Sequence, residues 1–199
     1  ASCATTPPGT GHAWFASEPS SVADQYLATA NPVTVSAETT LSFFHDYDTE
    51  NSYDGGVAEY STDGGSNWTD LGSLITQNGY SGTISSSYSN PLGNRSAFEG
   101  TSSGYVQTLA DLSSLSGLDV DFRFRMGTDS SVSGTGWYVD DIEIGSLVKL
   151  TSIATASGGA SATHTLTSNV VAPASNNAPT LTTNTGLSLL EGASASVGS

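Results

Sequence analysis

The sequence predicts an all-β fold, a two-sheet antiparallel β-sandwich, from two observations. Short segments alternate apolar and polar residues, and turns rich in Gly, Asn, Asp and Ser separate them. No stretch reads as a good helix. Apolar residues make up only 36% of the chain, but aromatic residues at 9% are enough to build a core.

Five segments carry the alternating pattern, and they are residues 39–47, 56–62, 104–109, 118–126 and 136–144. In the fourth segment, Phe122 and Phe124 lie on one face and Arg123 and Arg125 on the other. The phenylalanine face is therefore expected to point into the core.

The composition changes after about residue 150, where Ala, Ser, Thr, Gly and Asn dominate. We expect residues 1–11 to be flexible, 12–150 to form the sandwich, 151–179 to be a linker and 180–199 to begin a following β module that is cut short. One alternative stays open, because the alternation of residues 147–153 could add an edge strand.

Charge excludes several classes of partner. The chain has 19 acidic and 4 basic residues, a net charge of −15. Binding to nucleic acid or to anionic membranes depends on Lys and Arg, so neither is expected. Clustered carboxylates are instead compatible with a divalent cation.

The cysteine count and the absence of targeting signals suggest where the protein acts. Cys3 is the single cysteine, so it cannot form an internal disulfide. No signal peptide and no run of eighteen apolar residues is present. Few Cys and Lys with many Ser, Thr, Gly and Asp suit a secreted or cell-surface bacterial protein stabilised by metal, and we expect this chain to be a section of a longer protein.

The acidic loop after the first long strand is the most informative motif. It places carboxylates at Asp48, Glu50 and Asp54, followed by two glycines. Calcium takes six to eight oxygen ligands from loops that can wrap it, so the spacing predicts a structural calcium site. The alternative is a solvated acidic turn.

Asp140 adds to the calcium hypothesis. If Ile142 and Ile144 face the core, alternation carries Asp140 inward with them. A buried carboxylate is costly unless it is paired or bound to metal. Because Arg123 and Arg125 are on an outer face, a metal ion or backbone N–H groups are the expected partners.

Three further patterns favour structural roles. The residues from Ser61 to Trp68 match the Asp-box pattern, read here as a tight hairpin built on Asp63. The Gly-x-Ser-x-Gly string at Ser102 lacks the strand–elbow–helix context of a hydrolase nucleophile. His45 is expected to be a hydrogen-bonded core residue. No catalytic residue is therefore predicted, although a glycosidase using Glu59 or Glu99 remains an alternative.

Aromatic side chains leave open a second function, carbohydrate binding, since exposed rings can stack on sugars. The candidates are Trp14, Tyr53, Tyr80, Tyr88 and Trp137.

Several strings together carry a family resemblance: Ala13-Trp-Phe, Asp24-Gln-Tyr-Leu, Leu41-Ser-Phe-Phe-His-Asp-Tyr-Asp-Thr-Glu, Phe124-Arg-Met-Gly-Thr-Asp-Ser-Ser and Gly136-Trp-Tyr-Val-Asp-Asp-Ile-Glu-Ile. They resemble the C-terminal jelly-roll domain of immune inhibitor A-type metallopeptidases and, more distantly, MAM adhesion domains. Residues 178–192 resemble the start of a cadherin-like repeat.

The resemblance implies a jelly roll of the MAM or galactose-binding kind that binds calcium and serves a larger protein, such as a protease or adhesin, as a non-catalytic accessory or adhesion domain. It implies metal ligands at Asp48, Glu50, Asp54 and Asp140, with Asp24 as a weaker addition. The expected partners are glycans or another surface protein, and neighbouring domains of the parent chain.

Overall fold

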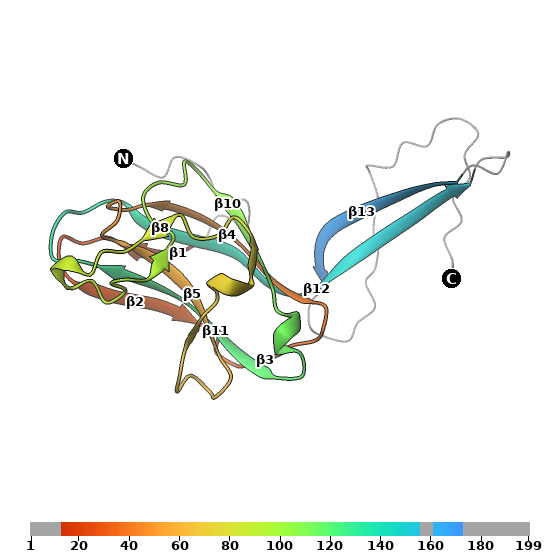
Figure 1. The fold of residues 1–199 in the computed structure, drawn as a ribbon, viewed down its shortest axis with the longest axis horizontal. Coiled ribbons are helices and arrows are strands. Elements are labelled where there is room, and N and C mark those ends of the chain that lie inside the picture. The colour runs from red at the N-terminus through yellow and green to blue at the C-terminus, as the bar shows by residue number, and fades with distance from the viewer. Residues whose placement is uncertain (1–12, 156–160, 173–199) are drawn as a thin grey trace. The chain divides into compact units, whose positions relative to one another are not determined.

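The structure is a computed structural model that describes residues 13–155 and 161–172 (Figure 1). The chain divides into two compact units, Ala1–Gly145 and Ser146–Ser199. The predicted N-terminal stretch at residues 1–11 and the predicted module start at 180–199 lie outside the described residues.

Two antiparallel sheets make up the first unit. One sheet has the strand order β1 (Trp14–Ser17), β12 (Gly136–Thr155), β4 (Thr39–Asp48), β10 (Val106–Asp111) and β7 (Ile75–Gln77). The other has the order β2 (Ala23–Ala28), β11 (Asp119–Thr128), β5 (Gly55–Ser61) and β6 (Thr69–Asp70), with β3 (Val33–Thr34) also paired to β11. The pairings are antiparallel. The predicted fold class, an all-β sandwich, is confirmed.

Short elements connect these strands. They are the two-stranded ribbon of β8 (Gly82–Thr83) and β9 (Ser96–Ala97), and the 3-10 turns η1 (Gly72–Leu74), η2 (Ser87–Ser89) and η3 (Ser113–Leu115). No helix in the described part of the chain is long and apolar enough to cross a membrane.

Aromatic rings from both sheets meet in the core. Phe43 of β4 packs edge-on against Phe124 of β11, with ring centroids 4.9 Å apart, and Phe124 lies 6.1 Å from Trp137 of β12. Phe43 and Trp137 are fully buried. The predicted inward face of β11 is confirmed, since Phe122 and Phe124 are buried there.

His45 lies in this core and is fully buried. Its Nδ1 accepts a hydrogen bond from Trp137 Nε1 at 3.1 Å, so Nε2 carries the proton and donates to Thr108 Oγ1 at 2.9 Å. Burial lowers the pKa of His45 to about 3, and the ring stays neutral at ordinary pH. His45 is therefore a hydrogen-bonded core residue, as predicted.

A second, smaller apolar cluster lies on the other face of the second sheet. Val57 of β5 is fully buried there under Ile84, Leu92 and Ala97, which belong to the segment carrying β8 and β9, and Tyr80 packs against them. This segment therefore covers part of the outer face of the sheet.

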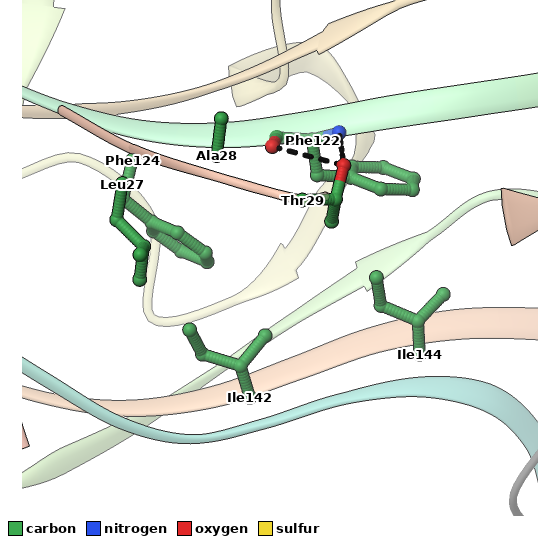
Figure 2. A pocket seen from close by; sticks show the side chains of 7 residues that line it. All are labelled: Leu27, Ala28, Thr29, Phe122, Phe124, Ile142 and Ile144. Atoms are coloured by element: carbon green, nitrogen blue, oxygen red, sulfur yellow. Dashed lines mark hydrogen bonds between the residues drawn. The ribbon is translucent and has the colours of Figure 1, made fainter. Parts of the chain in front are cut away.

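The alternation of β12 shifts by one residue at Asp141, which has a φ of 46°. Val139 is buried before this point, whereas Ile142 and Ile144 line an apolar pocket with Phe122 and Phe124 after it (Figure 2). A left-handed residue in a strand is typical of a bulge, which reverses the faces beyond it. Ile142 and Ile144 thus share one face, on which Ile142 is 37% exposed, and Asp140 does not share it.

Of the predicted linker at residues 151–179, the structure describes residues 151–155 and 161–172, and both stretches are strand. β12 continues to Thr155 and pairs with β13 (Ser161–Ala172) through the register Leu150↔Leu166 and Ile153↔Thr163. Thr and other β-branched residues favour extended strands, and backbone pairing needs no apolar core. The expectation of an additional strand at residues 147–153 agrees with this arrangement.

Candidate metal centre

Three strand ends bring acidic residues together at one end of the sandwich. Glu18 directly follows β1, Glu50 and Asp54 lie in the loop between β4 and β5, and Asp129 directly follows β11. β12 is the neighbour of both β1 and β4 in the first sheet, so these two strands run in the same direction and end at the same edge. We call Glu18, Glu50, Asp54 and Asp129 the carboxylate cluster.

Backbone N–H groups fix three of the four carboxylates. Glu18 Oε1 accepts from Glu50 N at 2.7 Å, and Asp54 Oδ1 accepts from Asp129 N at 2.6 Å. Asp129 Oδ1 accepts from Ser131 N at 2.7 Å. The hydrogen bonds link the three segments, so the carboxylates are held in place by the backbone rather than by flexible side chains.

The second oxygen of each cluster carboxylate is buried and has no hydrogen-bond partner among the described residues. These atoms are Glu18 Oε2, Glu50 Oε2, Asp54 Oδ2 and Asp129 Oδ2. Oxygens of Glu50, Asp54 and Asp129 lie within 4.8 Å of one another. Buried polar atoms are rarely left unsatisfied, so these oxygens could serve as ligands to a positive partner.

Burial and mutual repulsion shift the pKa values of the cluster carboxyls. Burial raises the pKa of Glu18 to about 8, and the neighbouring Asp54 carboxyl contributes to the increase. Burial also raises the pKa values of Asp54 and Glu50, with repulsion from Asp129 adding to both. Below about pH 8 a proton on Glu18 relieves part of the repulsion, and a bound cation would relieve it when all four groups are ionised.

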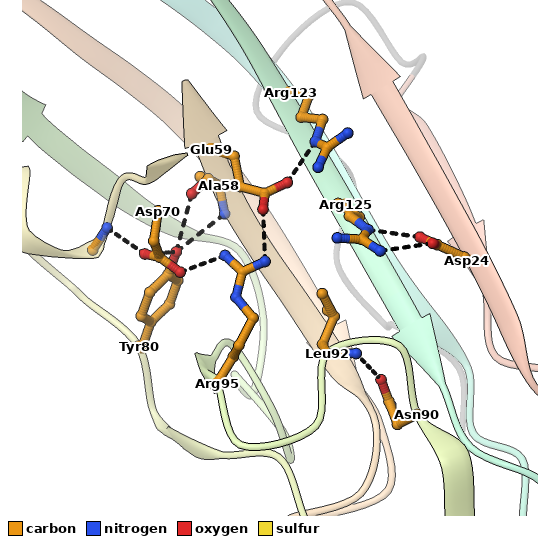
Figure 3. Close-up of polar contacts among 11 residues, drawn as sticks. Asp24, Ala58, Glu59, Asp70, Tyr80, Asn90, Leu92, Arg95, Arg123 and Arg125 are labelled. Carbon is orange, nitrogen blue, oxygen red and sulfur yellow. Dashed lines mark hydrogen bonds and ion pairs between the residues drawn. The ribbon is translucent and has the colours of Figure 1, made fainter. Parts of the chain in front are cut away.

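Arginine does not supply that cation. Each of the three arginines pairs elsewhere, over the outer face of the second sheet (Figure 3). Arg123 and Arg95 both bind Glu59, Arg95 also binds Asp70, and Arg125 binds Asp24.

Gly134 leaves room for the cluster. A Cβ atom at this position would lie 2.1 Å from Glu18 Oε2 and 2.7 Å from the backbone oxygen of Asp48. Any other residue would therefore displace Glu18 or the backbone of the acidic loop. The carboxylates, backbone anchors and space together form a site that could bind a metal ion.

Of the predicted ligands, the structure places Glu50 and Asp54 in the cluster. Asp48 lies at the start of the same loop, but hydroxyl groups occupy both of its carboxylate oxygens: Thr101 donates to Oδ1 at 3.1 Å and Thr135 to Oδ2 at 3.0 Å. Asp48 thus holds neighbouring loops around the cluster.

Asp24 and Asp140 lie outside the cluster. The two oxygens of Asp24 accept from the Arg125 guanidinium at 2.7 and 2.8 Å, and this arginine lowers the pKa of Asp24. Asp140 is five residues beyond Thr135, about 17 Å away along an extended strand. Its Oδ1 accepts from Asp141 N, whereas Oδ2 is buried and unpartnered. The backbone N–H partner agrees with one of the two partners expected for Asp140, whereas the bulge at Asp141 separates Asp140 from the face of Ile142 and Ile144.

Glu18 and Asp129 were not predicted from the sequence. Each is an acidic residue immediately after a strand, which is the signal that could have found them. Asp129 even lies within the string from Phe124 to Ser131 that supports the family resemblance. Their proximity to Asp54 depends on strand order, which the sequence alone did not give.

The Asp-box prediction of a tight hairpin agrees with the structure. Asp63 Oδ1 accepts from Ser61 Oγ and from Asn67 N, at 2.8 and 2.9 Å, in the turn between β5 and β6. Gly64 and Gly65 have φ values of 71° and 82°. Hydrogen bonds from Asn67 are the main cause that lowers the pKa of Asp63 to about 2.

The residues of the glycosidase alternative make structural contacts. Glu59 bridges two arginines, and Glu99 Oε2 accepts from Ser52 N at 2.7 Å. Of the aromatic candidates, Trp137 is core and Trp14 packs against it, whereas Tyr88 is 59% exposed and contacts Tyr53. Tyr80 lines an open pocket.

Comparison with protein families gives one match, to the family described as immune inhibitor A-like, MAM domain, over residues 1–171. Comparison with curated proteins gives no match. The family match includes the acidic loop and all four members of the carboxylate cluster. The chain therefore belongs to the immune inhibitor A-like MAM domain family.

Proposed function

We propose that this domain is a calcium-stabilised, non-catalytic accessory module that gives a larger secreted or surface protein an adhesive or targeting function. Membership of the MAM family supports the accessory role. The observation that carries the calcium proposal is the convergence of Glu50, Asp54 and Asp129, whose oxygens lie within 4.8 Å of one another and include buried atoms without a hydrogen-bond partner.

The chemistry of the cluster favours calcium over other metals. All four side chains offer oxygen, the donor that hard cations prefer, and the chain has only one cysteine. The ligands come from three separate segments rather than from one regular element. Calcium tolerates such irregular geometry, whereas magnesium demands a near-ideal octahedron and keeps several waters.

The proposed role of the ion is structural. It would join the ends of β1, β4 and β11, and so tie the two sheets together at one end. An ion that binds the folded state alone stabilises it, by about 2.7 kcal/mol when free calcium is about one hundred times Kd.

Thermal unfolding of the protein with calcium, magnesium or EDTA tests the proposal. We expect a melting temperature several degrees higher with calcium than with EDTA, and a smaller effect of magnesium. Equal melting temperatures in calcium and EDTA would remove the support for a bound ion.

A matched pair of variants locates the site. Asp129→Asn changes a cluster carboxylate, and we expect it to abolish most of the calcium response. Asp140→Asn changes another half-buried carboxylate outside the cluster, and its calcium response should match that of the wild type. The opposite pattern would move the ion to the site that the sequence suggested around Asp140.

The adhesive part of the proposal predicts a partner outside the chain, either a glycan or another surface protein. Neighbouring domains of the parent protein are further candidate partners. Binding of the fluorescently labelled domain to bacterial or host cell surfaces, compared with a labelled domain of similar charge, measures this directly. Equal binding of the two domains would contradict an adhesive role.

A further inference from the structure

An open pocket of about 560 Å³ lies beside β6 and uses no member of the carboxylate cluster. Its lining residues are Asp70, Gly72, Ser73, Tyr80, Arg95 and Ser96. We propose that this pocket binds an uncharged saccharide. The proposal rests on the proposed adhesive function, whose glycan partner it specifies, and it is independent of the metal site because no residue is shared between the two.

The pocket presents a fixed donor beside a fixed acceptor. Arg95 donates to Glu59 at 2.6 Å and to Asp70 at 2.5 Å (Figure 3). Asp70 also accepts from Tyr80 Oη at 2.9 Å and from Gly72 N at 2.7 Å. These contacts hold both charged groups in place before any ligand arrives, which reduces the entropy cost of binding.

Hydrogen-bonding capacity remains on both groups. A guanidinium has five N–H donors, of which Arg95 uses two in its ion pairs. The Asp70 side chain is 39% exposed, so its oxygens can accept further bonds. A hydroxyl group accepts from a guanidinium and donates to a carboxylate at the same time, and a sugar offers such hydroxyls on adjacent carbons.

The charge balance favours an uncharged ligand. Arg95 and Arg123 are offset by Glu59 and Asp70, so this ion-pair network has no net charge. An anionic ligand would meet these carboxylates in a chain with a net charge of −15. A cationic ligand would meet the two arginines.

Aromatic rings extend the surface beyond the pocket. Glu59 connects Arg95 to Arg123, and the Arg123 guanidinium lies 4.3 Å from the Trp68 ring and 5.8 Å from the Tyr26 ring. Tyr26 is 62% exposed. Rings of this kind offer an apolar face for the C–H groups of a sugar, so an oligosaccharide rather than a monosaccharide fits this surface.

Titration of the calcium-loaded protein with neutral oligosaccharides, followed by amide NMR, tests the inference. The probes are cellopentaose, xylopentaose, mannopentaose and chitopentaose, with an oligogalacturonate as the acidic comparison. We expect at least one neutral probe to shift the resonances of Gly72, Ser73 and Ser96, with a Kd on the order of 1 mM for so open a site, and the acidic probe to bind more weakly. Absence of shifts with all four neutral probes overturns the proposal.

A blocking variant tests whether the saccharide binds in this pocket or makes nonspecific contacts elsewhere on the surface. Ser73 is exposed at the pocket wall and takes no part in the ion pairs, so Ser73→Tyr fills the space without disturbing the fold. We expect a loss of affinity of about tenfold or more. Ser114→Tyr, at an exposed position in η3, is the control and should bind like the wild type. Unchanged affinity of Ser73→Tyr overturns the proposal.

The same titration in EDTA tests the saccharide proposal independently of the calcium proposal. Binding that persists without calcium in the folded protein supports the saccharide pocket whatever the metal site does. Binding abolished in EDTA while the protein stays folded contradicts a pocket that is independent of the carboxylate cluster.

Discussion

Acidic side chains occur in two settings in this sandwich, and the contrast shows how each setting is balanced. On the outer face of the second sheet, Glu59, Asp70 and Asp24 are neutralised by arginines of the same chain. At the end of the sandwich, the carboxylate cluster is anchored by backbone N–H groups and has no arginine. The first region carries its own cations, whereas the second would take a cation from solution under the calcium proposal.

The largest expected effect on the free energy of unfolding comes from the ion pairs on the outer face of the second sheet. Glu59 is 3% exposed and bridges Arg95 and Arg123. Glu59→Gln removes the shared partner of two half-buried guanidinium groups, and breaking such a pair costs about 3 kcal/mol. Chemical denaturation should show this loss equally with calcium and with EDTA. A loss that appears only with EDTA would mean that the two regions are coupled.

The second largest expected effect on stability comes from a substitution in the carboxylate cluster. Asp54→Asn removes a fully buried charge whose unpartnered oxygen faces the other acids. We expect the variant to lose a calcium stabilisation of about 2.7 kcal/mol at saturating calcium. In EDTA it should be at least as stable as the wild type, because repulsion is relieved. A variant that is less stable than the wild type in EDTA would indicate that Asp54 stabilises the fold without metal.

The pH dependence distinguishes the regions further. The folded-state pKa of Glu18 is about 8, above its ordinary value of 4.5, so the folded form holds a proton that the unfolded form releases. Without metal, stability should therefore fall as pH rises from about 4.5 to about 8. With calcium the trend should reverse, since the ion binds the ionised carboxyls. Melting curves across this range, with and without EDTA, check both signs. Glu18→Gln should flatten the metal-free trend.

The smallest effect is expected at Asp24. Its ion pair with Arg125 lies at the surface, with the Asp24 side chain 43% exposed, and surface pairs of this kind contribute about 0.2–1 kcal/mol. Asp24→Asn should lower stability slightly and leave the calcium response unchanged. A reduced calcium response would restore Asp24 as a ligand, as the family resemblance implied.

The fold could be predicted from the sequence because the alternation of each strand is local. Two of the four cluster residues, Glu50 and Asp54, could be predicted because their spacing within one loop is also local. Glu18 and Asp129 could not, because only the order of strands brings them to that loop. Asp140 does not share the face of Ile142 and Ile144, because a single left-handed residue, Asp141, reverses the faces of β12.

The separation of the cluster residues along the chain has a consequence for folding kinetics. The hydrogen bond from Glu50 to Glu18 spans 32 residues, and that from Asp129 to Asp54 spans 75. An ion held by all four acids closes these loops as a cross-link would, in a chain whose single cysteine cannot do so. Its complete ligand set exists only after both sheets have docked. Calcium should therefore slow unfolding strongly and leave the folding rate almost unchanged.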